Sequence, residues 1–198
     1  MRIRAMATSV GSGRIELILG NMYSGKSSEA FRRARRHQIA GKRVIVVKYG
    51  KDTRYSATEC ATHDGTTMPA ISTGREITES LITKLIHDAD VIVFDEIQFL
   101  CGIASACEQL ANAGKIVIAD GLDGDSRREQ FGEVLKLIPI ADDYQKYKAV
   151  CHFCGNDAAF TLRIVESGAQ ELIGGIEAYR AACRQCFLAK GSKSLSSS

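Results

Sequence analysis

The stretch GNMYSGKS, at residues 20–27, constrains the fold of this chain more than any other feature. It satisfies the pattern G-x-x-x-x-G-K-[ST] and stands between an apolar run at 15–19 and a segment of helical pattern at 26–40. In that context the backbone N–H groups of the loop and the N-terminus of the helix form a cradle for phosphate. The order of the elements disfavours the competing interpretation, a chance glycine-rich turn, and the sequence therefore predicts a nucleotide-phosphate site.

The residues of this loop have predicted roles. Lys26 is expected to reach the terminal phosphates, and the Ser27 hydroxyl is expected to bind Mg²⁺. The residues expected to bind ATP are Gly20, Asn21, Met22, Tyr23, Ser24, Gly25, Lys26, Ser27 and Ser28.

Apolar runs alternate with helical patterns after this loop. Residues 43–49, 91–96 and 115–120 read as buried strands, and helices are expected at 76–87 and around 103–113. Residues 51–74 are expected to be long loops, and the basic run RRARR at 32–36 a solvated helix face. This alternation predicts an α/β fold of the P-loop, RecA-like kind, a parallel sheet with helices on both faces.

The stretch VIVFDEIQF, at 91–99, ends a predicted strand on two adjacent acids, Asp95 and Glu96. Successive strand side chains point to opposite faces, so the two acids are expected to have different roles. We predict that Asp95 holds the Mg²⁺ shell. Glu96 would then face the reacting centre and accept a proton there, although a structural ion pair is the alternative.

Four of the seven cysteines form two C-x-x-C pairs, Cys151 with Cys154 and Cys183 with Cys186. Four thiolates match a closed, tetrahedral Zn²⁺ site of structural type, with an iron–sulfur cluster as the alternative. His152 is read as a bystander. Such a grouping favours metal over disulfides, hence a reducing, cytoplasmic compartment.

Composition changes near Tyr147, where cysteine pairs and glycines begin. We expect a phosphate-binding domain at 14–146, a zinc-stapled lid domain at 147–190, and disordered tails at 1–13 and 191–198. Cys101 and Cys107 fall in an apolar helical stretch, where a thiol serves as a small hydrophobe. The net charge of +3 is too small to indicate nucleic acid, and no apolar run approaches the roughly 18 residues of a membrane span.

Two classes of function compete at this point. One is a small-molecule kinase with a closed acceptor pocket. The other is an ATPase module whose zinc unit binds nucleic acid or protein, although the segment between the cysteine pairs offers only Arg163 and Arg180 for phosphates. A GTPase would show an N-K-x-D motif, which this sequence lacks.

Several motifs together decide for the kinase class. They are GNMYSGKS, KYGKDTRY (48–55), ATHDG (61–65), DEIQF (95–99), GLDGD with FG (121–132), and CHFC, TLR, IGG and CRQC in the last 48 residues. In this order the chain resembles the type II thymidine kinases, a zinc-containing family of cellular and bacterial enzymes, from about residue 15 to 190.

The resemblance implies ATP-dependent phosphorylation of the 5′-hydroxyl of thymidine, and of deoxyuridine, for nucleotide salvage in DNA synthesis. It implies that Glu96 is the general base, that Arg54 lies near the phosphates, and that Asp52 lies near the sugar and metal. It further implies a homotetramer and feedback inhibition by dTTP. The residues that it implies for the base pocket are Phe99, Leu122, Phe131, Thr161, Leu172, Ile173, Gly174, Gly175 and Tyr179, with the backbone of 172–175 contacting the thymine edge.

One residue departs from the family pattern. Ser126 stands where the family commonly has an aromatic residue near the base. We therefore expect a roomier pocket that tolerates bulkier substituents on the nucleoside.

Overall fold

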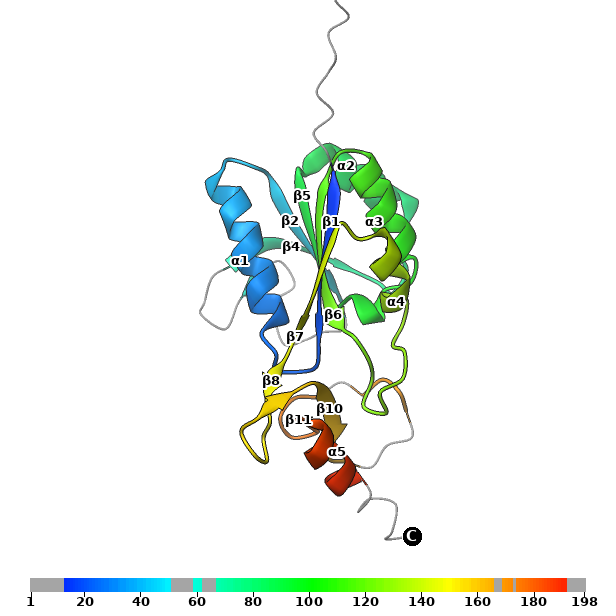
Figure 1. The fold of residues 1–198 in the computed structure, drawn as a ribbon. Helices are drawn as coiled ribbons and strands as arrows, with labels where there is room; N and C mark the ends of the chain where they lie inside the picture. Colours follow the sequence, from blue (N-terminus) through cyan, green and yellow to red (C-terminus); the bar gives the residue numbers. More distant parts are fainter. Residues whose placement is uncertain (1–12, 51–58, 62–66, 166–168, 173, 192–198) are drawn as a thin grey trace, which may run out of the picture.

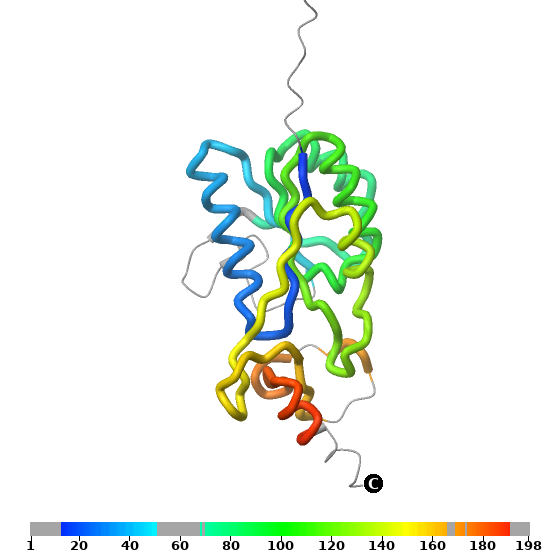
Figure 2. The backbone as a smooth tube through the Cα atoms, viewed as in Figure 1, coloured from blue at the N-terminus to red at the C-terminus, as the bar shows by residue number. Residues whose placement is uncertain are grey.

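A seven-stranded sheet forms the centre of the molecule (Figures 1 and 2). The structure is a computed structural model that describes residues 13–50, 59–61, 67–165, 169–172 and 174–191. The strand order is β3-β4-β2-β5-β6-β1-β7, in which β3 is antiparallel to β4 and all other neighbours are parallel. The strands are β1 Arg14–Gly20, β2 Val44–Tyr49, β3 Glu59–Ala61, β4 Thr67–Thr73, β5 Val91–Asp95, β6 Ile116–Leu122 and β7 Asp143–Tyr147.

Helices cover both faces of this sheet, as the sequence predicted. Helix α1 (Lys26–Ile39) lies on one face, where Phe31 packs into one apolar cluster. Helices α2 (Glu79–Asp88), α3 (Ile103–Asn112) and the short α4 (Val134–Leu137) lie on the other. Two 3₁₀ turns, Ile97–Phe99 and Ile138–Ile140, complete this part. The predicted α/β class is confirmed.

A smaller unit follows β7 and lies at the end of the sheet where β1 and β6 finish (Figure 1). It contains the hairpins β8 Ala149–Val150 with β9 Asp157–Ala158, and β10 Phe160–Arg163 with β11 Tyr179–Ala182, followed by helix α5 (Arg184–Gly191). Within the part of the chain that the structure describes, no helix is both long and apolar enough to cross a membrane.

Some sequence expectations about the elements were wrong. Part of the predicted loop at 51–74 forms β3 and β4, because β4 pairs with buried β2 and gains a place for Met68 in the core. Its sequence, TMPAIST, shows little of this, since it carries a proline and three hydroxyl residues. Strand β7, DYQKY, was missed because it is a polar, largely exposed edge strand.

Two further boundaries differ. Helix α2 begins at Glu79, three residues later than predicted, because the Thr78 hydroxyl caps it by accepting from the Leu81 N–H at 3.3 Å. Cys101 precedes α3 and is half-buried, whereas Cys107 is a fully buried core residue, as predicted. Helix α5 extends to Gly191, the first residue of the expected tail. Residues 1–12 and 192–198 lie outside the described residues.

The basic run on α1 is only partly solvated, which corrects its interpretation. Arg33 donates to Glu16 and Glu29 at 2.8 Å each and to Gln145 at 3.1 Å, so it ties α1 to β1 and β7. Its side chain is 13% exposed, compared with 59% for Arg32. Hydrogen bonds from Arg32 and Arg33, opposed by burial, lower the pKa of Glu29 to about 2.

We expect Arg33→Ala to lower the free energy of unfolding by about 1–3 kcal/mol, because it removes the cation shared by Glu16 and Glu29 and leaves each with only a more exposed arginine. Arg32→Ala should lower the free energy of unfolding by much less, since Arg32 is exposed and solvent screens its ion pair with Glu29. The pKa of Glu29 is depressed on folding, so its contribution is present above the ordinary value of 4.5 and is lost as the pH falls toward 2. Urea titrations at pH 7 and pH 3 measure the free energy of unfolding of both variants and its dependence on pH. Equal decreases for Arg33→Ala and Arg32→Ala would contradict the role assigned to Arg33.

Candidate active site and metal centre

The loop between β1 and α1 adopts a backbone conformation that depends on two of its glycines, Gly20 and Gly25. Gly20 has φ 153°, and a Cβ there would lie 2.5 Å from the Tyr147 carbonyl oxygen. Gly25 has φ 81°, in the left-handed region that favours glycine, and it immediately precedes α1. The loop therefore presents its backbone at the helix N-terminus, the geometry of an anion site.

Lys26 is buried at the base of this loop. Its ammonium donates to the Asn21 carbonyl oxygen at 2.9 Å, and the Ser24 hydroxyl donates to the same oxygen at 2.8 Å. Only 7% of Lys26 is exposed, so water screens its positive charge poorly. The charge therefore acts strongly on an anion bound in the loop.

Two buried carboxylates meet the Ser27 hydroxyl. The Ser27 Oγ lies 3.1 Å from Asp95 Oδ1, at the end of β5, and 3.1 Å from Asp120 Oδ1, in β6. Burial, together with the charges of Asp95 and Glu96, raises the pKa of Asp120 well above its usual range, against the opposing effect of Lys26. Hydroxyl and carboxylate oxygens are the donors that Mg²⁺ prefers, so this group fits that ion.

Sequence reasoning missed Asp120. The predicted strand at 115–120 ended on it, which was the available signal. Its significance depends on β6 lying between β1 and β5, and that order cannot be read from the chain.

Glu96 is not part of a strand, which corrects the argument from strand alternation. Strand β5 ends at Asp95, and Glu96 follows with φ 55° and ψ 48°, in the left-handed region that is uncommon for glutamate. This turn in the backbone, rather than the pleat of a strand, directs the two acids to different places. Asp95 reaches Ser27, whereas Glu96 lines the neighbouring pocket.

Gln98 positions Glu96. Its amide nitrogen donates to Glu96 Oε2 at 2.5 Å, while its carbonyl oxygen accepts from the Leu122 N–H at 3.0 Å. Gln98 is 3% exposed and is thereby fixed between the end of β6 and the carboxylate. Sequence reasoning missed this role as well, although Gln98 stands in the DEIQF motif.

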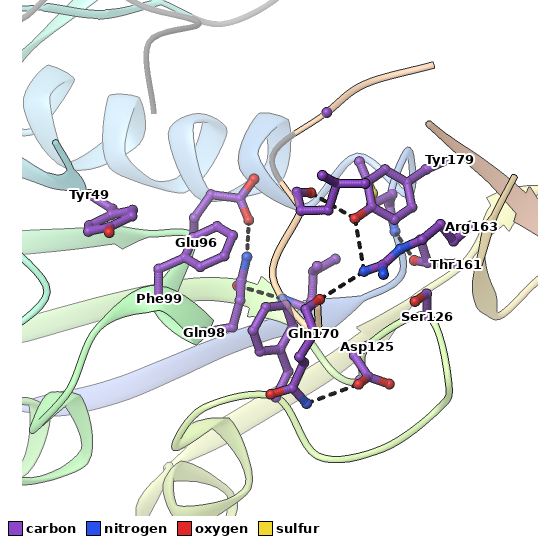
Figure 3. A pocket seen from close by; sticks show the side chains of 16 residues that line it. Tyr49, Glu96, Gln98, Phe99, Asp125, Ser126, Thr161, Arg163, Gln170 and Tyr179 are labelled. Carbon is purple, nitrogen blue, oxygen red and sulfur yellow. Dashed lines mark hydrogen bonds between the residues drawn. The ribbon is translucent and has the colours of Figure 1, made fainter. Parts of the chain in front are cut away.

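A pocket opens beside Glu96, with about 620 Å³ of empty space, part of it open to solvent (Figure 3). Its wall is aromatic on one side: Tyr49 stacks on Phe99 with ring centroids 5.5 Å apart, and Phe99 meets Phe131 edge-to-face at 5.5 Å. These rings suit a flat, apolar ligand such as a nucleobase. Tyr49 was not predicted as a pocket residue.

The small C-terminal unit closes the other side of the pocket. The Tyr179 hydroxyl donates to the Leu172 carbonyl oxygen at 2.7 Å, and Arg163 donates to the carbonyl oxygens of Ala169 and Gln170 at 2.6 and 2.9 Å. Figure 3 shows Arg163 and Tyr179 side by side at this wall. These bonds shape the backbone of 169–172 as a cover.

The cover is attached to the larger domain at two places. Gln170 donates to Asp125 Oδ2 at 2.9 Å (Figure 3). It also donates to the Gln130 carbonyl oxygen at 3.0 Å. Glu171 forms an ion pair with Arg75, whose guanidinium lies 5.6 Å from the centroid of the Tyr49 ring. Segments far apart in the sequence thus enclose one space.

The C-terminal unit also contacts the phosphate loop directly. The Thr161 hydroxyl accepts from the Met22 N–H at 3.0 Å, and Asn21 donates to the Phe160 carbonyl oxygen at 3.2 Å. Thr161 therefore contacts both the pocket and the loop that precedes α1.

The structure brings together most of the predicted pocket residues. The pocket is lined by Glu96, Phe99, Leu122, Phe131, Thr161, Leu172, Gly174 and Tyr179, and by Ser126. Gly175 lies outside the lining, and its N–H is bonded to Glu177. Asp52, Arg54 and Ile173 lie outside the described residues. The catalytic and binding roles of all these residues stay predictions.

The four paired cysteines converge on one point. Cys151 and Cys154 lie in the turn between β8 and β9, and Cys183 and Cys186 lie at the start of α5. All four sulfurs are within 4.8 Å of one another, and Cys154 Sγ is 3.7 Å from Cys183 Sγ. A tetrahedral site with Zn–S bonds of about 2.3 Å requires sulfurs roughly 3.8 Å apart, so the cluster fits Zn²⁺.

The backbone around this cluster also favours thiolate. Although burial opposes it, hydrogen bonds from the N–H groups of Cys183, Phe153 and Cys154 lower the pKa of Cys151 to about 6. Burial and the neighbouring thiols raise the pKa of Cys186 to about 12, which a bound cation would reverse.

Comparison with known proteins agrees with this geometry. The model of the family described as thymidine kinase matches residues 13–187. The chain belongs to the thymidine kinase family. It is 44% identical over 183 residues to the cytosolic thymidine kinase of Homo sapiens, covering 91% of this chain and 75% of that protein.

Other thymidine kinases show similar values. Identity is 42% over 188 residues to the cytosolic thymidine kinase of Gallus gallus, covering 93% of this chain and 81% of that protein. It is 44% over 175 residues to the thymidine kinase of sheeppox virus (strain KS-1), covering 88% and 97%. The family implies ATP as phosphate donor, and the cysteine cluster is compatible with a zinc site.

We expect Cys154→Ser to remove near-stoichiometric zinc from the purified thymidine kinase. The C-terminal unit should lose about 4 kcal/mol or more of stability, the range reached when a structural metal is lost. Cys101→Ser, at a half-buried cysteine outside the cluster, is the matched control and should keep its zinc. Elemental analysis and thermal unfolding measure both; zinc-free wild-type protein with four free thiols would overturn the assignment.

Proposed function

We propose that this thymidine kinase transfers the γ-phosphoryl group of ATP to the 5′-hydroxyl of thymidine, and of deoxyuridine, with Glu96 as general base. The observation that carries the proposal is the position of the Glu96 carboxylate. It lies in the wall of a pocket lined by aromatic rings, next to the loop that leads into α1. Family membership supports thymidine as the acceptor.

The phosphate side of the site would bind ATP with Mg²⁺. The loop from Gly20 to Ser28 would surround the phosphates, and Lys26 would balance their charge. Ser27 and Asp95 would hold Mg²⁺, which when bound neutralises charge on the phosphates. Arg54 and Asp52 complete the proposal on the strength of the family resemblance alone.

On the acceptor side, the protein orients an alcohol and takes its proton. Gln98 holds the Glu96 carboxylate through Oε2, and in the proposed reaction this carboxylate accepts the proton of the 5′-hydroxyl. The stacked rings of Tyr49 and Phe99 fix the plane of the base, and the cover at 169–172 excludes water that would otherwise accept the phosphoryl group.

The base would be recognised mainly by the backbone of the cover. Arg163 and Tyr179 hold the carbonyl groups of this segment in place. Backbone donors and acceptors whose positions are fixed discriminate strongly against bases with a different polar edge. This supports a narrow choice of pyrimidine.

The competing function, an ATPase module whose zinc unit binds nucleic acid or protein, is disfavoured by the same geometry. The surface of the C-terminal unit around Thr161 and Tyr179 faces the pocket and the phosphate loop, and so is used within the chain. ATP hydrolysis without phosphorylation of any nucleoside would favour that alternative.

We also propose a homotetramer, feedback inhibition by dTTP and a cytoplasmic location. The family resemblance supports the first two, and the names of cytosolic relatives support the third. Our division of the chain into units at 14–146 and 147–190 is likewise a proposal. Sedimentation of the purified chain and initial-rate competition between dTTP and thymidine test the first two.

Glu96→Gln should lower kcat for dTMP formation by about 10²-fold or more, the usual effect of removing a general base. Binding of ATP should change little, because Glu96 lines the nucleoside pocket. Glu108→Gln, an exposed change on α3, is the matched control and should keep full activity. Product analysis with thymidine, deoxyuridine, deoxycytidine and deoxyadenosine provides the measurement, and a Glu96→Gln enzyme with wild-type kcat would overturn the assignment.

Ser126→Phe should narrow the choice of substrate. Ser126 lines the pocket between Asp125 and the cover, and a ring there would occupy space that bulky substituents on the nucleoside could use. We expect kcat/KM for substituted nucleosides to fall about tenfold or more relative to thymidine, the scale of steric discrimination in such pockets. An unchanged ranking across a substrate panel would refute the idea of a roomier pocket.

A further inference from the structure

Asp120 is a buried carboxylate whose bonding is incomplete. It belongs to β6, the strand between β1 and β5, and is 0% exposed. Its Oδ1 lies 3.1 Å from Ser27 Oγ, but Oδ2 has no hydrogen-bond partner among the described residues. A buried carboxylate oxygen without a partner is costly, and such groups are usually paired with a cation or bound to a metal.

The Ser27 hydroxyl can donate a hydrogen bond to only one of the two neighbouring acids. It carries one proton, whereas Asp95 Oδ1 and Asp120 Oδ1 both lie 3.1 Å from its oxygen. The two carboxylates come from adjacent parallel strands, with Phe94 beside Ala119 in the register, so they reach Ser27 from neighbouring positions. Their mutual repulsion in a buried setting is relieved either by protonation of one acid or by positive charge at this place.

Lys26 supplies only part of that charge. Its ammonium donates to the Asn21 carbonyl oxygen, and no hydrogen bond to Asp120 is formed within the described part of the chain. A small divalent cation bound by one or two carboxylates, a hydroxyl and phosphate oxygens fits the remaining donors.

We propose that Asp120 is a second carboxylate of the Mg²⁺ site, across the Ser27 hydroxyl from Asp95. It would hold the ion directly or through one ordered water. The inference rests on the proposed kinase function, because the phosphates of the bound nucleotide would complete the same coordination shell.

The experiment is a Mn²⁺ titration of wild-type protein, Asp120→Asn and Asp88→Asn, each saturated with ADP, with free Mn²⁺ followed by its EPR signal. Asp88→Asn is the matched control, since that carboxylate is exposed and paired with Lys84. We expect Asp120→Asn to weaken Mn²⁺ binding roughly 10- to 100-fold, as changes close to bound metals do, and Asp88→Asn to leave it unchanged. Asp120→Asn should unfold at a temperature no lower than that of wild type, because asparagine matches aspartate in size and carries no charge that burial would penalise.

Asparagine also imitates a neutral, protonated aspartic acid. If Asp120 served only as such a buried acid, Asp120→Asn would bind Mn²⁺ as tightly as wild type, and that result overturns the proposal. Asp120→Ser provides the same comparison should the first variant fail to fold. Thymidine phosphorylation by the wild type is assayed separately, so that a kinase with unchanged Mn²⁺ binding in Asp120→Asn refutes only the role of Asp120, whereas a wild type inactive on every nucleoside refutes the proposed function.

Discussion

The parallel pairing of β1, β6 and β5 is the constraint on which the rest of the site depends. It aligns the carboxyl ends of three strands, so that the phosphate loop, Asp120 and Asp95 arrive at one edge of the sheet. The acids are buried there against Ser27, in a setting that favours a bound cation or a protonated acid. Apolar burial on both faces of the sheet keeps this arrangement rigid, because a shift in strand register would disrupt the close packing of the buried side chains of β5 and β6.

The C-terminal unit that holds the cysteine cluster is connected to this edge through side chains of the pair β10–β11. The cysteine cluster joins the turn after β8 to the start of α5, and the hairpin β10–β11 lies between them. Thr161 on that hairpin accepts from Met22 in the phosphate loop, and Tyr179 holds the cover of the base pocket. A metal bound by the cysteine cluster, away from the pocket and the phosphate loop, can therefore affect both the phosphate side and the nucleoside side of the site.

Much of the fold could be predicted from sequence because its buried strands are continuous apolar runs and its phosphate loop has a strict pattern. The positions of β1, α1, β2, β5 and β6 follow from these signals. Strands β4 and β7 could not be predicted in this way, since pairing with neighbours, rather than their own composition, makes them strands. The cysteine cluster was predictable from spacing alone, because C-x-x-C pairs have few other uses in such a chain.

The separation of Asp95 from Glu96 shows where sequence reasoning reached a sound conclusion for the wrong reason. Strand alternation predicted different faces, but the structure separates the acids by a left-handed residue immediately after β5. Gln98 then holds Glu96 from a 3₁₀ turn that no periodicity indicated. The position of Asp120 beside Ser27 can likewise be inferred only when the strand order is known.

The proposed mechanism requires that Glu96 contact the acceptor hydroxyl rather than the metal. The most direct measurement is a crystal structure of the protein with thymidine, Mg²⁺ and a non-hydrolysable ATP analogue. If Glu96 is the general base, the thymidine 5′-oxygen will lie within about 3.2 Å of a Glu96 carboxylate oxygen, and the base will pack against Tyr49 and Phe99. A complex in which Glu96 binds the metal, or in which thymidine lies outside this pocket, would contradict it.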